Sequence, residues 1–163
     1  WRGTKADIYE AGHRVPFMVR WTNNLKPRQL DETVCLADVT ATLVDLLDLK
    51  ADPLQMEDSH SLVPLFRDNE FNRKPVIHQS GSGAIAIRKG DYKLILCNGS
   101  GGREVPKGKP FTKPYQLYNL AKDPYETEDL IRSKADIALR LENEFFEIAG
   151  DDLTEDDMLK LSK

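Results

Sequence analysis

Apolar residues recur at helical spacing in the first half of the chain, directly after Asp38. The spacing i, i+4, i+7 and i+8 places them on one face of a helix. We expect this helix to begin at Asp38, whose side chain is a suitable N-cap, and to end near Leu49. The apolar face consists of Val39, Leu43, Leu46 and Leu47.

A second helix is predicted near the end of the chain. Ser133 and Asp136 resemble a capping box at its start, and Gly150 is a typical helix terminator. Its apolar face consists of Ile137, Leu141, Phe145 and Ile148. The acidic segment 151–163 that follows could add a short helix through Met158 and Leu161.

Between these helices the pattern changes from helical spacing to the alternation that is typical of strands. The segment "GAIAIRKGDYKLILCNGS" has Lys89-Gly90-Asp91 as a turn between two antiparallel strands, with "PVIHQS" before it and "YQLYNL" after it as further strands. One face of the hairpin carries Ile85, Ile87, Tyr92, Leu94 and Leu96. Arg88 and Lys93 lie on opposite sides of the hairpin turn, and we expect them to be solvated. The Gly- and Pro-rich segment 98–114 is predicted to be a long loop, either functional or mobile.

The apolar segment 15–21 is predicted to be a buried strand of a largely covered sheet. Such a strand needs neighbours on both sides, and an unpaired strand edge tends to pair with another chain. We therefore expect residues 1–21 to be poorly anchored within this chain, and self-association through the exposed N-terminal strand is a possible consequence. Residues 75–148 are expected to form a compact unit on their own.

Composition restricts the class of protein. The chain has 163 residues, of which 40% are hydrophobic and 31% are charged, enough for one globular domain or for a small domain plus the edge of another. The predicted order of strand, helix, strands and helix indicates the α+β class. The net charge of −4 without a basic stripe argues against nucleic acid and an anionic membrane as partners. Cys35 and Cys97 lack zinc-ligand spacing, so a metal site is not expected; free thiols are favoured over a disulfide.

Candidate chemistry is sparse, because the chain contains no phosphate-binding loop, no nucleophile elbow and no zinc-protease motif. The opening loop is the exception. Gly3 and Thr4 allow a tight turn that could project the ammonium group of Lys5 toward an oxyanion. On chemistry alone, a solvated surface lysine is the favoured interpretation of Lys5. His78, at the end of a predicted strand, is a second candidate, although a histidine hydrogen-bonded at a strand end is the simpler interpretation.

Several motifs together resemble the C-terminal part of the type I sulfatases, which belong to the alkaline-phosphatase-like superfamily. They are "RGTKADIYEAGHRVPFMVRW", "LADVTATLVDLLDL", "SLVPLF", "GAIAIRKGDYKLI" and "YQLYNLAKDPYETEDL". The resemblance implies the last strand and loop of a sulfatase-type α/β domain, followed by a small antiparallel sheet packed on a C-terminal helix. Residues 1–74 would end the catalytic α/β domain, and residues 75–163 would form a C-terminal subdomain.

The resemblance also implies roles for individual residues. Lys5 occupies the position of a lysine that contacts the substrate's sulfate group, which would make it both a catalytic and a substrate-binding residue. His78 lies in a region that faces the substrate pocket in many sulfatases. The E-x-G-x-R-V-P motif is expected to be structural and to fix the loop; its residues here are Glu10, Gly12, Arg14, Val15 and Pro16.

Sulfatases also use a formylglycine, made from a C/S-x-P-x-R motif, and Ca²⁺ bound by Asp and Asn residues. Neither cysteine of this chain lies in such a motif, so both groups are expected upstream, in the full-length enzyme, and no cofactor is expected in this chain. The fragment alone would then be inactive, whereas the intact enzyme would hydrolyse aryl or carbohydrate sulfates. The family's members are typically exported, that is, periplasmic, secreted or lysosomal.

Two alternatives remain open at this point. A phosphonate or phosphate ester hydrolase of the same superfamily would share the motifs of this segment. A non-catalytic binding or structural module could also keep the fold. The nucleophile motif that separates these alternatives lies outside the sequence.

Overall fold

A computed structural model describes residues 1–150 of the chain, which divide into two compact units. The first, here called the sheet unit, consists of Trp1–Pro16 together with the chain from Ile77 onward. The second, here called the helical unit, is Phe17–Val76. The predicted boundary between residues 74 and 75 concerns the domains of a longer protein, and it stays a prediction. None of the helices described is long and apolar enough to cross a membrane.

The sheet unit is built on four strands in the spatial order β1-β2-β3-β4. They are β1 (Val76–Gln79), β2 (Ile85–Lys89), β3 (Tyr92–Ile95) and β4 (Gln116–Asn119). β3 pairs antiparallel with both β2 and β4, and Leu94 lies opposite Ile87 and Leu117. The predicted hairpin is confirmed, with Gly90 at a φ of 55° in its turn, a conformation that glycine adopts without strain.

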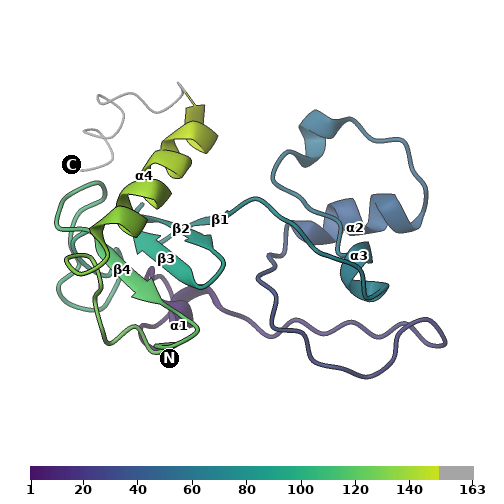
Figure 1. The fold of residues 1–163 in the computed structure, drawn as a ribbon, viewed down its shortest axis with the longest axis horizontal. Coiled ribbons are helices and arrows are strands. Elements are labelled where there is room, and N and C mark those ends of the chain that lie inside the picture. Colours follow the sequence, from purple (N-terminus) through teal and green to yellow (C-terminus); the bar gives the residue numbers. More distant parts are fainter. Residues whose placement is uncertain (151–163) are drawn as a thin grey trace. The chain divides into compact units, whose positions relative to one another are not determined.

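Both faces of this sheet are covered. Helix α4 (Ala135–Ala149) packs Ala138, Leu141 and Phe145 on the face that carries Ile87 and Leu94. The N-terminal segment covers the opposite face, where it buries Ile8 and Tyr9 before the short helix α1 (Glu10–His13). Figure 1 shows α4 in yellow-green along the sheet, with the purple α1 segment beside it. The predicted small antiparallel sheet packed on a C-terminal helix is confirmed.

The anchoring of residues 1–16 corrects an expectation from the sequence. We expected this segment to be loose without a parent sheet, but Ile8 and Tyr9 are 0% and 1% exposed. The backbone N–H of Ile8 also donates to the carbonyl oxygen of Ser100 at 2.8 Å. The loop 98–114 therefore serves as a support for the N-terminal segment.

The start of α4 also differs from the prediction. The capping box is not formed, because the hydroxyl of Ser133 donates instead to the carbonyl oxygen of Leu130 at 3.3 Å, and Lys134 is the N-cap without a side-chain cap bond. The predicted end is correct: Gly150 follows the helix with a φ of 63°. The predicted extension into residues 151–163 lies outside the described residues.

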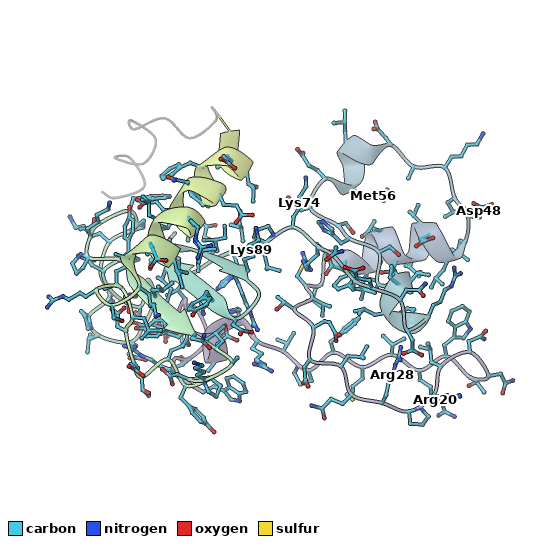
Figure 2. All side chains as sticks on the ribbon, in the orientation of Figure 1. Arg20, Arg28, Asp48, Met56, Lys74 and Lys89 are labelled. Atoms are coloured by element: carbon cyan, nitrogen blue, oxygen red, sulfur yellow. The ribbon has the colours of Figure 1, made fainter. Side chains whose placement is uncertain are left out.

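The helical unit contains α2 (Asp38–Leu46), the one-turn 3₁₀ helix η1 (Pro53–Met56) and the one-turn helix α3 (Val63–Phe66). The predicted N-cap role of Asp38 is wrong, because Asp38 lies inside the first turn and its carboxylate accepts the backbone N–H groups of Cys35 and His60 at 2.8 and 3.0 Å. The helix ends at Leu46, three residues before the predicted end. Arg28, labelled in Figure 2, joins the irregular segment after Trp21 to α3 by donating to the carbonyl oxygen of Leu65 and pairing with Asp68.

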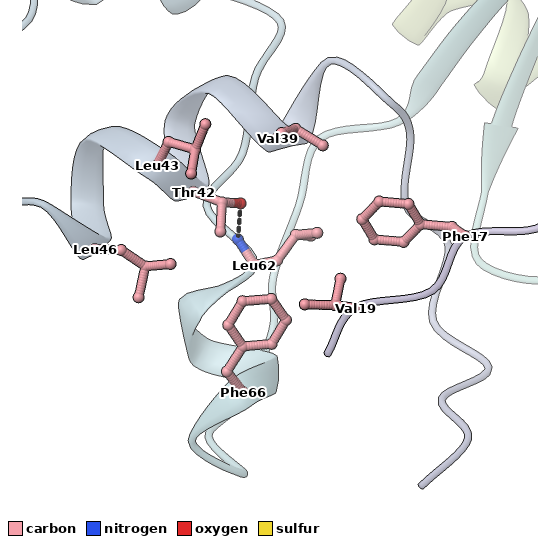
Figure 3. A pocket seen from close by; sticks show the side chains of 8 residues that line it. All are labelled: Phe17, Val19, Val39, Thr42, Leu43, Leu46, Leu62 and Phe66. Atoms are coloured by element: carbon pink, nitrogen blue, oxygen red, sulfur yellow. Dashed lines mark hydrogen bonds between the residues drawn. The ribbon is translucent and has the colours of Figure 1, made fainter. Parts of the chain in front are cut away.

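The face of α2 that is buried is not the predicted apolar one. Asp38 and Thr42 are the buried residues of this helix, whereas Leu43 and Leu47 are 51% and 63% exposed. The reason is a set of polar contacts across the unit, since the Thr42 hydroxyl accepts the backbone N–H of Leu62 at 2.9 Å. The apolar face instead borders a shallow hollow of about 160 Å³, shown in Figure 3. Its lining residues are Phe17, Val19, Val39, Thr42, Leu43, Leu46, Leu62 and Phe66.

The predicted buried strand at residues 15–21 is wrong for this chain. In the part of the chain that the structure describes, these residues form no strand, and Met18 is 89% exposed. A β-strand requires hydrogen-bonding partners on a neighbouring strand, and the four described strands pair only with one another. The segment is apolar, but the hydrogen-bonded pairing with a neighbouring strand that a β-strand requires is not formed within residues 1–150.

Candidate functional site

Lys5 lies at the corner of a β-turn formed by Thr4, Lys5, Ala6 and Asp7. The backbone N–H of Asp7 donates to the carbonyl oxygen of Thr4 at 2.9 Å and closes the turn. Ala6, the third residue, has a φ of 84°, the value that type II turns require at this position. The side chain of Lys5 is exposed, and no hydrogen bond or ion pair within residues 1–150 involves its ammonium group. The turn thus presents an unneutralised cation to solvent.

A second closure of the turn comes from the side chain of Asp7. One carboxylate oxygen accepts the backbone N–H of Thr4 at 2.7 Å. The other accepts the backbone N–H groups of Arg103 and Glu104 at 2.5 and 3.1 Å. Burial alone would raise the pKa of this carboxyl, but the N–H groups of Thr4, Glu104 and Arg103 outweigh burial and lower the pKa below its ordinary value. Asp7 is therefore ionised and bridges the Lys5 turn to the loop at residues 103 and 104.

Two glycines pack directly against Ala6. The backbone N–H of Gly81 donates to the carbonyl oxygen of Ala6 at 2.9 Å, and a Cβ at Gly81 would lie 2.8 Å from the Ala6 Cβ. A Cβ at Gly102 would lie 2.4 Å from the Ala6 oxygen and 2.5 Å from an Asp7 carboxylate oxygen. Larger side chains at these two positions would push the turn out of place, so this close approach requires glycine.

Arg2 anchors the segment before the turn. Its guanidinium donates to the Glu104 carboxylate, to the Tyr118 hydroxyl and to the Glu126 carbonyl oxygen, each at 3.1 Å. It also lies over the ring of Tyr9, 3.8 Å from the ring centroid. These contacts join the start of the chain to β4 and to the loop that follows β4.

A buried ion network anchors the segment after the turn. The Lys93 ammonium donates to the carboxylates of Glu10 and Glu126 at 3.1 and 2.8 Å, and all three residues are at most 1% exposed. Arg88 donates to Glu10 at 3.4 Å, and Glu126 accepts the Glu10 backbone N–H at 2.7 Å. Burial alone would raise the pKa of Glu10, but His13, Lys93 and Arg88 lower it far below its ordinary value.

The expectation that Arg88 and Lys93 are solvated is therefore wrong. Their positions opposite one another in the hairpin place them on the face that the N-terminal segment covers, which alternation alone does not reveal. Glu10, predicted to be structural, is confirmed as an anchor through partners that lie 78 and 83 residues away in sequence. Sequence reasoning also missed the role of Asp7, two of whose three backbone partners lie 96 and 97 residues away.

His78 lies on β1, behind the N-terminal segment. Its Nε2 is 3.4 Å from the carbonyl oxygen of Ile8, and its ring stacks on that of His13 with the centroids 3.8 Å apart. Burial, together with the charges of His13 and Lys93, lowers the pKa of His78 to about 3, so its imidazole is neutral at ordinary pH. The structure thus brings His78 next to the loop motif, and its predicted contact with substrate stays a prediction.

Metal and thiol chemistry find little support among the described residues. Within residues 1–150, no group of three or more His, Cys, Asp or Glu side chains is arranged to hold a metal ion. Cys35 and Cys97 are both free, and burial raises the pKa of the Cys97 thiol. The candidate site of this chain therefore consists of the Lys5 turn and its supports.

Comparison with known sequences identifies related proteins, although no family model matches the chain. The chain is 29% identical over 150 residues to an N-acetylgalactosamine-6-O-sulfatase of Bacteroides thetaiotaomicron, a match that covers 86% of this chain and 28% of the relative. It is 27% identical over 93 residues to an arylsulfatase of Hemicentrotus pulcherrimus, covering 56% of this chain and 17% of the relative. The chain thus spans less than a third of the length of these curated relatives.

Solved structures lead to the same group of proteins. A Bacteroides thetaiotaomicron structure from work on the metabolism of multiple glycosaminoglycans (BT33336S-sulf) superposes with a TM-score of 0.76 at 27% identity, over 89% of this chain and 31% of that one. Ps i-CgsB in complex with k-i-k-neocarrahexaose has a TM-score of 0.52 at 21% identity, over 71% and 24% of the two chains, and shows the fold alone. The chain is therefore a sulfatase homologue, similar over most of its length to a part that makes up about 30% of those proteins.

Proposed function

We propose that this chain is the C-terminal part of an enzyme that hydrolyses sulfate esters, and that Lys5 contacts the sulfate group. The observation that carries the proposal is the match of 86% of the chain to an N-acetylgalactosamine-6-O-sulfatase, together with a free cation on a rigidly supported turn in the opening motif. The relative's name favours a sulfated carbohydrate over a simple aryl sulfate as the substrate.

The chemical role of Lys5 follows from its charge. Negative charge grows on the departing oxygen as the sulfate ester is cleaved, and a cation placed in advance stabilises that charge without reorganising. An ammonium group also suits sulfate, because it is a compact point charge that donates in any direction. The exposed Lys5 ammonium, on a turn supported from both sides, supports this proposed role.

The remaining chemistry of a sulfatase does not fit the described residues. A formylglycine needs the C/S-x-P-x-R motif, in which neither Cys35 nor Cys97 lies, and no acidic cluster within residues 1–150 would hold calcium. We therefore assign neither group to this chain and derive no step through either. The nucleophile and the metal ion belong to the rest of the proposed enzyme.

The test is Lys5→Ala in the enzyme that contains this segment, assayed on a sulfated N-acetylhexosamine and an aryl sulfate. We expect kcat to fall by roughly 10²- to 10³-fold with a smaller change in KM, because the charge acts mainly in the transition state. Lys5→Arg should recover little of this loss. Lys89→Ala is the control, since Lys89 pairs with Glu144 on the surface, and it should leave kcat unchanged.

Each other outcome argues against the proposal. A near-normal kcat in Lys5→Ala would make Lys5 an ordinary surface charge. Turnover of phosphate or phosphonate esters in place of sulfate esters would favour the related ester hydrolases. An intact protein that turns over neither ester would favour a non-catalytic module.

We also propose that the chain self-associates through residues 17–21 when it is isolated. Met18 is 89% exposed and Trp21 is 42% exposed, in an extended segment without a strand partner in the described chain. Analytical ultracentrifugation should detect dimers that Met18→Lys weakens. A strictly monomeric wild-type chain at about 100 µM, or dimers that Met18→Lys leaves intact, would contradict this proposal.

A further inference from the structure

The turn that carries Lys5 is closed from both ends by one residue. The backbone N–H of Asp7 donates to the Thr4 oxygen, and the Asp7 carboxylate accepts the Thr4 N–H in return. Two hydrogen bonds between Thr4 and Asp7 therefore enclose Lys5 and Ala6, one through the Asp7 backbone and one through its side chain. The Asp7 side chain is therefore one of the two contacts that close the turn.

The same carboxylate fixes the turn to a second part of the chain. Its other oxygen accepts two adjacent backbone N–H groups, from Arg103 and Glu104, and Asp7 as a whole is 2% exposed. Three donors therefore converge on one buried carboxylate, which only an ionised acid can satisfy from both oxygens. An asparagine would keep one acceptor and turn an NH₂ donor toward an N–H group.

We propose that Asp7 is a positioning residue for Lys5: it sets the place of the Lys5 ammonium by closing the Thr4–Asp7 turn and fixing it to the loop at Arg103 and Glu104. This inference rests on the proposed role of Lys5. The close packing of Gly81 and Gly102 against the turn supports it, because a Cβ at either position would displace Ala6 from its present contacts.

Position matters here because a preorganised charge acts only where charge develops. A displacement of about 1 Å of a group near the reacting centre can cost about 10²-fold in rate. Asp7 itself is out of reach of a substrate, since it is 2% exposed and its carboxylate faces three backbone N–H groups of the chain. It acts through Lys5, and its effect should therefore depend on Lys5.

A double-mutant cycle separates positioning from general stability. We expect Asp7→Asn to lower kcat by about 10- to 100-fold with little change in KM. In the Lys5→Ala background, Asp7→Asn should change kcat by less than about twofold, because the charge it positions is already absent. Asp123→Asn is the matched control: the Asp123 carboxylate also accepts backbone N–H groups, from Thr127 and Glu128 at 2.6 and 2.7 Å, and its loss should not affect kcat.

A second variant tests the same contact if Asp7→Asn does not fold in the full enzyme. Gly102→Ala does not alter the Asp7 side chain itself. Its added Cβ would instead push the Asp7 carboxylate and the Ala6 oxygen away from the loop. It should reproduce the loss of kcat, again only when Lys5 is present. In the 163-residue chain, Asp7→Asn should speed hydrogen exchange at the Thr4, Arg103 and Glu104 amides and leave the exchange of the Leu94 amide unchanged.

The outcomes distinguish this inference from the proposed function. If Lys5→Ala leaves kcat near normal, the proposed function fails and this inference fails with it. If Lys5→Ala lowers kcat but Asp7→Asn lowers it further by the same factor in both backgrounds, only the positioning role is wrong. Unchanged exchange at the three amides would also overturn the positioning role.

Discussion

The two units of the chain bury different kinds of residue. The sheet unit buries apolar side chains on both faces of its sheet. It also buries the ion network of Glu10, Lys93 and Glu126. The helical unit buries Asp38 and Thr42 from α2, whereas Leu43 and Leu47 on the same helix are exposed. Most of the exposed large apolar side chains within residues 1–150 belong to the helical unit.

This difference indicates how far each unit compensates its buried charges and covers its own apolar side chains. A buried charge is tolerated only when an opposite charge or hydrogen-bond donors compensate it. In the sheet unit, Glu10, Lys93 and Glu126 each have an oppositely charged partner within 3.1 Å, and Asp7 accepts three backbone N–H groups. Contiguous exposed apolar side chains, in contrast, are a feature of surfaces that other chain segments cover. The sheet unit covers both faces of its sheet, whereas the helical unit leaves more of its large apolar side chains exposed.

The largest effect in this comparison is expected from Lys93→Met in the sheet unit. Methionine fills similar space, but the buried carboxylates of Glu10 and Glu126 would lose their shared cation. Breaking a buried ion pair by removing one partner costs about 3–5 kcal/mol of unfolding free energy. Urea unfolding of the isolated chain measures it, with Lys89→Met on the exposed Glu144 pair as the control. A cost below about 1 kcal/mol would mean that the network is not needed for stability.

A smaller effect is expected from pH through His78. Its pKa is lowered from 6.5 to about 3 in the folded chain, so the unfolded chain takes up a proton first as the pH falls. The contribution of His78 to the free energy of unfolding is therefore fully present above pH 6.5. It is lost as the pH falls toward 3, by about 2 kcal/mol between pH 6.5 and 4.5. His78→Phe should flatten this pH dependence. The pKa of Glu10 is lowered from 4.5, so its own contribution is lost only below that pH.

The smallest effect is expected from Asp38→Asn in the helical unit. The buried carboxylate of Asp38 accepts two backbone N–H groups and pairs with Arg73, and asparagine would keep only one acceptor oxygen. We expect a loss of about 1 kcal/mol. Hydrogen exchange at the α2 amides measures it within this unit, while the α4 amides serve as the reference. A loss larger than that of Lys93→Met would reverse the comparison between the units.

Local pattern was sufficient for several elements of this protein. The hairpin around Gly90, the strand at residues 116–119 and the end of the last helix at Gly150 follow from alternation, turn residues and helical spacing, each confined to a few neighbouring residues. The sequence motifs also indicated the sulfatase homology that the comparisons show. The prominence of Lys5 came from that resemblance, since its chemistry alone favoured a surface charge.

Only the tertiary structure determined which side chains are buried and what they contact. Lys93 was expected in solvent, yet it is buried because Glu10, 83 residues away, covers the second face of the hairpin. Asp7 accepts one backbone N–H from Thr4 nearby, but its other two backbone partners lie 96 and 97 residues away. The segment 15–21 was expected to be buried, and the apolar residues of α2 to share one face, but periodicity shows which residues share a face and not whether another part of the chain covers it. Periodicity arises from backbone geometry within a few residues, whereas burial and ion pairing depend on contacts between segments that are distant in sequence.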